Sequence, residues 1–258
     1  PRSEWSRLID VSKLPAGVGP KTVGGGLCPG SACAPGDCKT CWETCGSCPS
    51  AEDIYGCPKT GQWALTFDDG PSPYTRTLLD TLDRLKVKVT FFFLGGHVAQ
   101  YPDIVKRAYD AGHIVASHTW SHPHLSSLPN DQLIAEIKAT ENAIFNATGA
   151  RPALIRPPYG EADERVKAVF KQLGYRSVMW NMDCTDYAVL AAKQDSAKIF
   201  QAFQNALTKP TGLNFKNDAG FISLQHDIFS ESVDMEERIV SLLREKGHVL
   251  TTVAECAG

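Results

Sequence analysis

From residue 58 to the end of the 258-residue chain, short apolar runs of strand length alternate with segments whose apolar residues recur at helical spacing. This alternation predicts an α/β fold, with parallel strands joined by crossover helices. A closed or nearly closed barrel is favoured over a doubly wound sheet, and the lack of a glycine-rich loop after the first strand argues against nucleotide binding. The seven expected strands are Trp63–Phe67, Val89–Leu94, His113–Ser117, Leu154–Arg156, Arg176–Trp180, Phe221–Leu224 and Val249–Val253.

The N-terminal part of the chain has a different composition. Of the 9 cysteines, most lie in the Gly- and Pro-rich segment Cys28–Cys57, which has too few apolar residues for a core of its own. Disulfides would hold such a segment, and they indicate a secreted protein. Its CxxC pairs, Cys38–Cys41 and Cys45–Cys48, lie too close together for a zinc ribbon. We therefore expect an N-terminal arm with a disulfide-rich extension over 1–57, followed by the barrel domain over 58–258.

Charge and hydropathy exclude several classes of partner. The net charge is −3 and no basic patch stands out, so neither nucleic acid nor an anionic membrane is an expected partner. No apolar run approaches the roughly 20 residues of a membrane span. Asn146-Ala147-Thr148 is a glycosylation sequon, which agrees with secretion. We expect a monomer that is secreted, in the extracellular space or the cell wall.

Polar side chains follow five of the seven expected strands at their carboxyl ends, where parallel α/β folds place active sites. The first strand runs into Asp68 and Asp69, and Gly70-Pro71 then stops it. Two neighbouring carboxylates are costly to desolvate unless a cation lies beside them, so the pair predicts a metal ion. The other polar strand ends are Ser117–His122, Arg156–Gly160, Asn181–Tyr187 and Leu224–Asp227.

Two histidines supply the remaining metal ligands. His118 and His122 are four residues apart, and one helical turn places such a pair on one side. Two imidazoles and one carboxylate suit a hydrolytic zinc ion with open positions. His124 is a rival ligand, but Pro123 turns the chain between them, so we prefer His118 and His122. One aspartate of the pair would bind the metal, and the other would take a proton from activated water.

These five segments resemble the five motifs of the polysaccharide deacetylases of carbohydrate esterase family 4, and most closely those of fungal chitin deacetylases. The resemblance implies a distorted (β/α)7 barrel and a divalent metal ion, zinc first and cobalt second. It also implies individual roles for the matching residues. These are Asp68 as general base, Asp69, His118 and His122 as metal ligands, Arg156 to orient the base, the backbone N–H of Tyr159 for the oxyanion, Asp186 to tune His226, and His226 as general acid.

Aromatic residues near the carboxyl ends of the expected strands are candidates for stacking on sugar rings. The resemblance implies substrate contacts for Trp120, Tyr159, Tyr187 and Leu224. Tyr187 stands where the fourth motif of the family usually has tryptophan, so one wall of the substrate groove would differ. Trp180 falls inside an expected strand, and we therefore assign it to the core.

The barrel also suggests how the cysteines pair. Cys57 precedes the first strand and Cys256 follows the last, so closure of the barrel would bring them together in a disulfide. The six cysteines of 28–48 would then pair among themselves in one of about fifteen ways. Cys184 is left as a free thiol.

The function implied is metal-dependent hydrolysis of N-acetyl groups from N-acetylglucosamine residues of chitin or chitooligosaccharides, releasing acetate. An acetylxylan esterase or a peptidoglycan deacetylase would use the same site. A carbohydrate-binding protein without turnover is an alternative of another class, although a binder needs neither the base Asp68 nor the acid His226. A glycosidase using Asp68 and Asp69 is disfavoured, because adjacent acids are poorly placed to flank a glycosidic bond.

Overall fold

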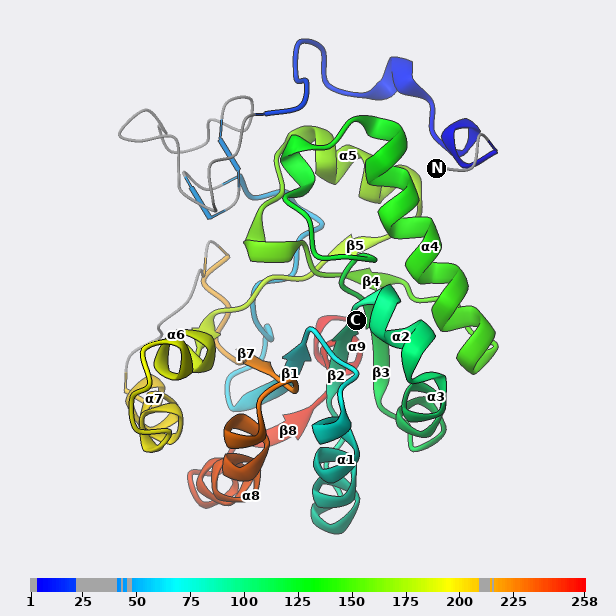
Figure 1. The fold of residues 1–258 in the computed structure, drawn as a ribbon. Coiled ribbons are helices and arrows are strands. Elements are labelled where there is room, and N and C mark those ends of the chain that lie inside the picture. The colour runs from blue at the N-terminus through cyan, green and yellow to red at the C-terminus, as the bar shows by residue number, and fades with distance from the viewer. Residues whose placement is uncertain (1–3, 22–40, 43, 46–47, 209–213, 215) are drawn as a thin grey trace.

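The computed structural model contains a curved sheet of parallel strands surrounded by helices (Figure 1). The strand order is β5-β4-β3-β2-β1-β7-β6, and β8 pairs with β1 off this path. The structure describes residues 4–21, 41–42, 44–45, 48–208, 214 and 216–258. The strands are β1 Gln62–Asp68, β2 Thr90–Phe93, β3 Ile114–Ser117, β4 Leu154–Ile155, β5 Arg176–Ser177, β6 Met182–Asp183, β7 Phe221–His226 and β8 Val249–Thr251.

The helices follow the apolar periodicity of the sequence and end at recognisable signals. Ser72 caps α1 through a reciprocal pair of hydrogen bonds with Thr75, and Pro73 occupies the first turn. Gly149 ends α4 in the left-handed conformation that glycine adopts without strain. The helices are α1 Pro73–Leu85, α2 Gly95–Gln100, α3 Pro102–Asp110, α4 Asn130–Thr148, α5 Glu164–Gln172, α6 Asp186–Ala191, α7 Ala197–Ala206, α8 Ser230–Glu245 and α9 Val253–Ala257.

All seven strands expected from the sequence are present, so the parallel α/β prediction is confirmed, and one additional strand lies where a loop was expected. The chain leaves the sheet after β5 and returns as β6, which pairs with β7. Asn181 directs this return. Its side-chain amide donates to the carbonyl of Gly220 at 2.8 Å, and its side-chain oxygen accepts from the N–H of Ile222 at 2.8 Å. A polar side chain, rather than an apolar run, therefore sets the position of β6.

The first and last strands lie side by side, as the expected disulfide requires. Residues 62–64 of β1 pair with β8, whereas residues 66–68 pair with β2. Cys57 and Cys256 form a disulfide with their Cα atoms 5.2 Å apart, which confirms the predicted pair. Cys184 is buried and free, also as predicted.

Part of the N-terminal segment belongs structurally to the barrel. Ile54 forms a parallel bridge with Val178 just beyond β5 and packs in an apolar cluster with residues of the sheet. The buried carboxylate of Asp53 accepts from Lys167 of α5 at 2.5 Å. Cys41, Cys45 and Cys48 are disulfide-bonded. The predicted pairing within 28–48 involves partners outside the described residues, and the domain boundary at residue 57 stays a prediction.

The main apolar core lies between the sheet and helices α1, α3, α7 and α8 (Figure 1). Trp63 of β1 is fully buried, stacks on Phe221 with ring centroids 4.3 Å apart, and contacts Phe203 of α7. This packing leaves the opposite, carboxyl end of β1 to polar residues.

Within the described residues, no helix has both the length and the apolar character that crossing a membrane would require.

Candidate active site

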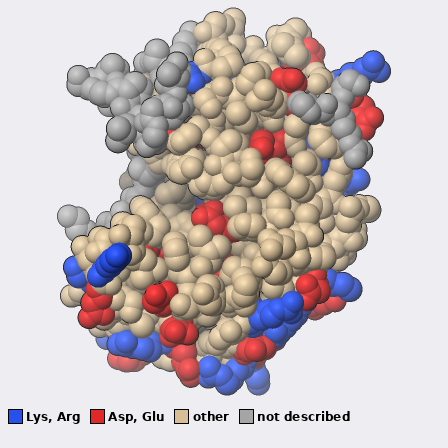
Figure 2. Space-filling model, viewed as in Figure 1, with Lys and Arg blue, Asp and Glu red and all other residues tan. Residues whose placement is uncertain are grey.

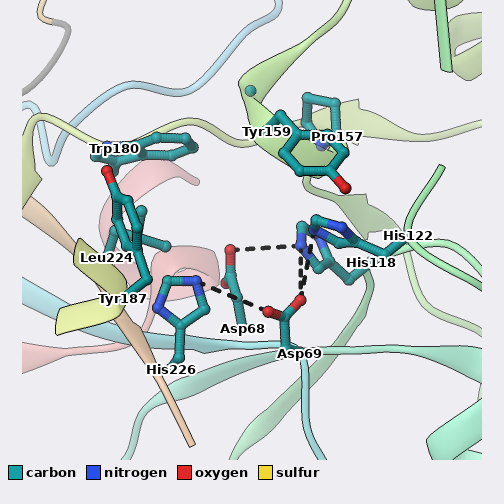
Figure 3. Close-up of a pocket in the computed structure, with 11 residues that line it drawn as sticks. Asp68, Asp69, His118, His122, Pro157, Tyr159, Trp180, Tyr187, Leu224 and His226 are labelled. Atoms are coloured by element: carbon teal, nitrogen blue, oxygen red, sulfur yellow. Dashed lines mark ion pairs between the residues drawn. The ribbon is translucent and has the colours of Figure 1, made fainter. Parts of the chain in front are cut away.

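The carboxyl ends of β1, β3, β4 and β7 meet at a pocket of about 330 Å³ (Figure 3). Parallel strands bring their ends to one edge of the sheet, so motifs far apart in the sequence converge there. The residues that line the pocket are Asp68, Asp69, His118, His122, Pro157, Tyr159, Gly160, Trp180, Tyr187, Leu224 and His226.

Asp69, His118 and His122 form a possible metal-ligand set. The Oδ1 atom of Asp69 lies 3.4 Å from Nε2 of His118 and 3.5 Å from Nε2 of His122 (Figure 3). One ligand atom from each residue falls within 4.8 Å of the others. Oδ1 of Asp69 is buried and has no hydrogen-bond partner among the residues that the structure describes, which is costly unless a cation binds there.

The protonation of the two imidazoles also suits a cation. Nδ1 of His118 donates to the carbonyl of Arg156 at 2.8 Å, which leaves the lone pair on Nε2 directed to the ligand set. Burial lowers the pKa of His118 well below its usual value and lowers that of His122, so both rings are neutral at pH 7. The chemistry of this donor set therefore fits zinc or a similar divalent ion.

Several residues around the pocket have backbone conformations that residues other than glycine rarely adopt. Positive φ angles occur at Asp69 (72°), Thr119 (72°), His122 (59°) and Tyr159 (59°). Each such residue costs about 1–2 kcal/mol, and the surrounding structure must hold it in place. This clustering is typical of a functional site.

Asp68 is buried beside the ligand set. One oxygen accepts from Nη1 of Arg156 at 2.7 Å, and the other lies 3.8 Å from Nε2 of His118. Burial raises the pKa of Asp68 to about 6, against the opposing effect of the Arg156 guanidinium. The carboxylate is still largely ionised at pH 7 and is a stronger base than an exposed aspartate.

Arg156 is completely buried, and each of its three guanidinium nitrogens donates at least one hydrogen bond. Besides Asp68, it donates to the hydroxyl of Thr66 at 2.7 Å and to the carbonyls of Val178 and Met179 at 3.2 and 2.9 Å. Its guanidinium lies 4.1 Å above the ring of Phe92. These contacts fix the position of Asp68.

His226 lies across the pocket from the ligand histidines (Figure 3). Its Nδ1 donates to Oδ1 of the buried Asp186 at 2.7 Å, and its backbone N–H donates to Oδ2 of the same carboxylate at 2.8 Å. The hydroxyl of Ser232 also donates to Asp186, at 2.6 Å. Burial lowers the pKa of His226, but the charge and the hydrogen bond of Asp186, together with the charges of Asp69 and Asp68, outweigh burial and raise this pKa to about 9. His226 is therefore protonated at neutral pH.

Tyr159, Tyr187 and Leu224 form walls of the pocket, where the motif resemblance placed them. The ring of His124 stacks on Tyr159 with centroids 4.3 Å apart, and Nδ1 of His124 pairs with the buried Glu161 at 2.7 Å. His124 thus supports an aromatic wall and lies outside the ligand set. Thr44 of the N-terminal extension reaches the carbonyl of Tyr159 at 3.4 Å.

Two tryptophans occupy positions that differ from expectation. Trp120 does not line the pocket; it lines a separate depression together with Trp5. An added Cβ on Gly95 would meet the Trp120 ring at 2.5 Å, so that ring packs on the start of α2. Trp180, assigned to the core, packs against an apolar cluster of the sheet and also lines the pocket, because β5 ends at Ser177 and the chain has already left the sheet at residue 180.

Nothing in the sequence indicates that three further residues contact the site. Nδ1 of His97 contacts the backbone carbonyl of Asp69 at 2.7 Å. Ser232 lies on α8 and holds Asp186. Glu136 of α4 binds the loop that carries both ligand histidines. Each acts through a partner distant in sequence, so spacing could not reveal it.

Known proteins resemble this chain in both sequence and structure. A family model described as polysaccharide deacetylase matches residues 55–178. The chitin deacetylase structure from Colletotrichum lindemuthianum superposes with a TM-score of 0.72 and 31% identity, covering 81% of this chain and 92% of that one. The chain belongs to the polysaccharide deacetylase family.

Relatives of this chain have different named substrates. It is 36% identical to chitin deacetylase 1 of Cryptococcus neoformans over 99% of its own length and 55% of the relative's. It is 35% identical to a peptidoglycan-N-acetylglucosamine deacetylase of Listeria monocytogenes over 81% of its own length and 42% of the relative's. The chain thus spans about half the length of these curated relatives.

Proposed function

We propose that this deacetylase removes N-acetyl groups from N-acetylglucosamine residues of chitin or chitooligosaccharides and releases acetate. The observation that carries the proposal is the pairing of a base and an acid around one ligand set. Asp68 lies 3.8 Å from His118, and His226 lies 3.9 Å from Asp69 on the other side. A protein that only binds sugar would need neither group.

Asp69, His118 and His122 would hold a divalent ion, for which zinc is our first candidate. When bound, such an ion polarises an acetamide carbonyl and lowers the pKa of water. The chain's own residues supply the proton transfers and the orientation of the substrate.

Asp68 is assigned the role of general base. Its raised pKa gives it enough basicity to accept a proton from the attacking water, and Arg156 keeps it in place. His226 is assigned the role of general acid, because it already carries a proton at neutral pH. It would give that proton to the departing amine, which is a poor leaving group without it.

The backbone N–H of Tyr159 is proposed to stabilise the oxyanion of the tetrahedral intermediate. The left-handed conformation of Tyr159 is strained, and a strained backbone at a pocket wall is consistent with a functional constraint. One such donor contributes about 10²–10³-fold to the rate in other enzymes. Trp180, Tyr187 and Leu224 would contact the sugar.

The lining of the pocket suits an uncharged sugar polymer. Apart from the ligand set, Asp68 and His226, its residues are uncharged. On the described part of the face shown in Figure 2, lysines and arginines lie next to acidic residues along the lower helices and not around the central hollow. The Cys57–Cys256 disulfide supports a protein that acts outside the cell, where oxidising conditions preserve it.

Acetate release from chitin oligomers, acetylated xylan and peptidoglycan, measured in parallel, tests the proposal. We expect release from the chitin oligomers with the chain length intact, loss on chelation and recovery on addition of zinc or cobalt. Asp68→Asn should abolish release while leaving zinc binding in place. Release from xylan or peptidoglycan alone would reassign the substrate, shortened chains would indicate a glycosidase, and no release from a zinc-loaded protein would favour a binding protein.

A further inference from the structure

The segment His118–His122 carries both histidines of the ligand set in a conformation that its own sequence disfavours. It is not a regular helical turn, and Thr119 and His122 both have positive φ angles. Neither residue is glycine, so contacts from outside the segment must hold this backbone. We call residues 118–122 the histidine loop.

Helix α2 holds one side of the histidine loop. The backbone N–H groups of Gly95 and Gly96 donate to the carbonyls of Thr119 and Trp120, at 2.9 and 3.1 Å. The Trp120 ring packs where Gly95 lacks a side chain. These contacts satisfy the carbonyls of the loop and leave its N–H groups to find other acceptors.

Glu136 of α4 accepts from the other side of the same loop. Its Oε2 atom accepts from the backbone N–H groups of Trp120 and Ser121, at 2.8 and 2.9 Å. Its Oε1 atom accepts from the hydroxyl of Ser121 at 2.8 Å. Both oxygens of one carboxylate thus bind two consecutive residues between the two histidines. Hydrogen bonds to a carboxylate are stronger than hydrogen bonds to a neutral acceptor, and they fix the geometry of the peptide groups that donate them.

We propose that Glu136 is a positioning residue for metal binding, and that it holds the histidine loop so that both imidazoles reach Asp69. This inference rests on the proposed function, because it assumes that the ligand set binds a divalent ion. Without Glu136, two N–H groups of the loop would lose their acceptor. The strained loop would then relax, and the two histidines would no longer be placed together.

The chain offers a matched control on the same helix. Glu141 lies five residues further along α4 and is also hydrogen-bonded, to Lys138 at 2.5 Å and to Tyr175 at 3.1 Å. It also pairs with Arg151. None of these partners lines the pocket. Glu141→Gln should therefore lower the melting temperature without changing affinity for zinc.

The test measures zinc affinity by competition with a chromophoric chelator, and it records the visible spectrum of the cobalt-loaded protein, so neither readout depends on turnover. We expect Glu136→Ala to weaken zinc binding about tenfold or more, and to alter the cobalt spectrum, as loss of a supporting partner does in other metal sites. Glu136→Gln keeps one acceptor oxygen and should restore part of the affinity.

Unchanged zinc affinity and an unchanged cobalt spectrum in Glu136→Ala would overturn the proposal, as would an equal loss of affinity in Glu141→Gln. If Glu136→Ala does not fold, Glu136→Gln and Ser121→Ala decide instead. Each should weaken zinc binding measurably, and wild-type affinity in both would refute the role of Glu136. A wild-type chain that binds neither zinc nor cobalt would refute the proposed function itself, which is a different result.

Discussion

His118, which is buried, and His226, which is partly buried, both lie at the carboxyl ends of parallel strands, and their surroundings give them opposite protonation states. Burial lowers the pKa of both. Nδ1 of His118 faces a backbone carbonyl, whereas Nδ1 of His226 faces the carboxylate of Asp186. His118 is therefore neutral and His226 carries a proton at pH 7.

The contrast shows that the partner on Nδ1 decides what the distant Nε2 atom can do. A carbonyl orients the ring without adding charge, so Nε2 keeps a lone pair for a metal ion. A carboxylate stabilises the imidazolium, so Nε2 keeps a proton to donate. In the proposed function, the same residue type thus serves as metal ligand on one side of the pocket and as general acid on the other.

Replacing the carboxylate of Asp186 by an amide is the most direct test of the difference between His118 and His226. In Asp186→Asn, His226 should lose its proton near neutral pH, because burial lowers its pKa and the charge and hydrogen bond of Asp186 are the largest effects that oppose burial. We expect kcat for deacetylation at pH 7.5 to fall by about 10²-fold or more, the usual contribution of a general acid. The pH dependence of kcat checks this, and zinc affinity should stay unchanged. A variant with full activity at that pH would remove His226 from the role of acid.

Glu236 is a buried carboxyl group whose hydrogen-bond partner is the side-chain amide of Gln225, so no positive charge among the described residues is paired with it. Burial raises its pKa to about 7, and Gln225 donates to it at 2.8 Å. Below the unfolded pKa of about 4.5, both states hold the proton and stability is complete. As pH rises towards 7 the unfolded state ionises first, so stability falls by up to about 3 kcal/mol and then levels off.

Glu236→Gln should remove this loss and leave the protein more stable than wild type at pH 8.5. Urea unfolding at pH 5 and pH 8.5, with metal held constant, measures the difference. Glu237→Gln is the matched control, because its carboxylate is exposed and pairs with Arg84. A variant at Glu236 with the wild-type pH dependence would contradict the prediction.

Removing the metal distinguishes the proposed ligand residues from the proposed acid by their effect on the stability of the folded protein. Zinc at about 100 times its dissociation constant should stabilise the folded protein by about 2.7 kcal/mol, since the unfolded chain lacks the assembled site. Thermal unfolding with and without a chelator measures this stabilisation. Asp186→Asn should retain it, whereas His122→Ala should lose it. Equal stabilisation by zinc in both variants would place the ion elsewhere.

The smallest expected effect is that of Ser232→Ala. Ser232 supplies one of the hydrogen bonds that hold the Asp186 carboxylate. Losing a bond of about 1 kcal/mol should reduce kcat roughly fivefold, while zinc affinity stays the same. Steady-state kinetics at saturating zinc give the ratio. A reduction as large as that of Asp186→Asn would mean that the hydroxyl acts on more than the position of the carboxylate.

The sequence predicted much of this site because its motifs lie at strand ends. Asp68, Asp69, His118 and His122 are close to one another along the chain or follow neighbouring strands, and they do meet in the pocket. Trp120, for which the resemblance implied a substrate contact, does not line the pocket, because a position in a motif does not say which way a side chain turns within a loop. Its ring instead occupies the space left by Gly95.

The sequence by itself determined the parallel α/β architecture, the edge at which the chemistry gathers and the Cys57–Cys256 disulfide. These follow from local patterns and from strand direction, which the chain encodes in short segments. Only the tertiary structure decided that Glu136 accepts hydrogen bonds from the histidine loop, that Asn181 joins the chain before β6 to β7, and that burial raises the pKa of Asp68. Such properties depend on which distant groups share a buried space, and that is fixed only when the chain packs.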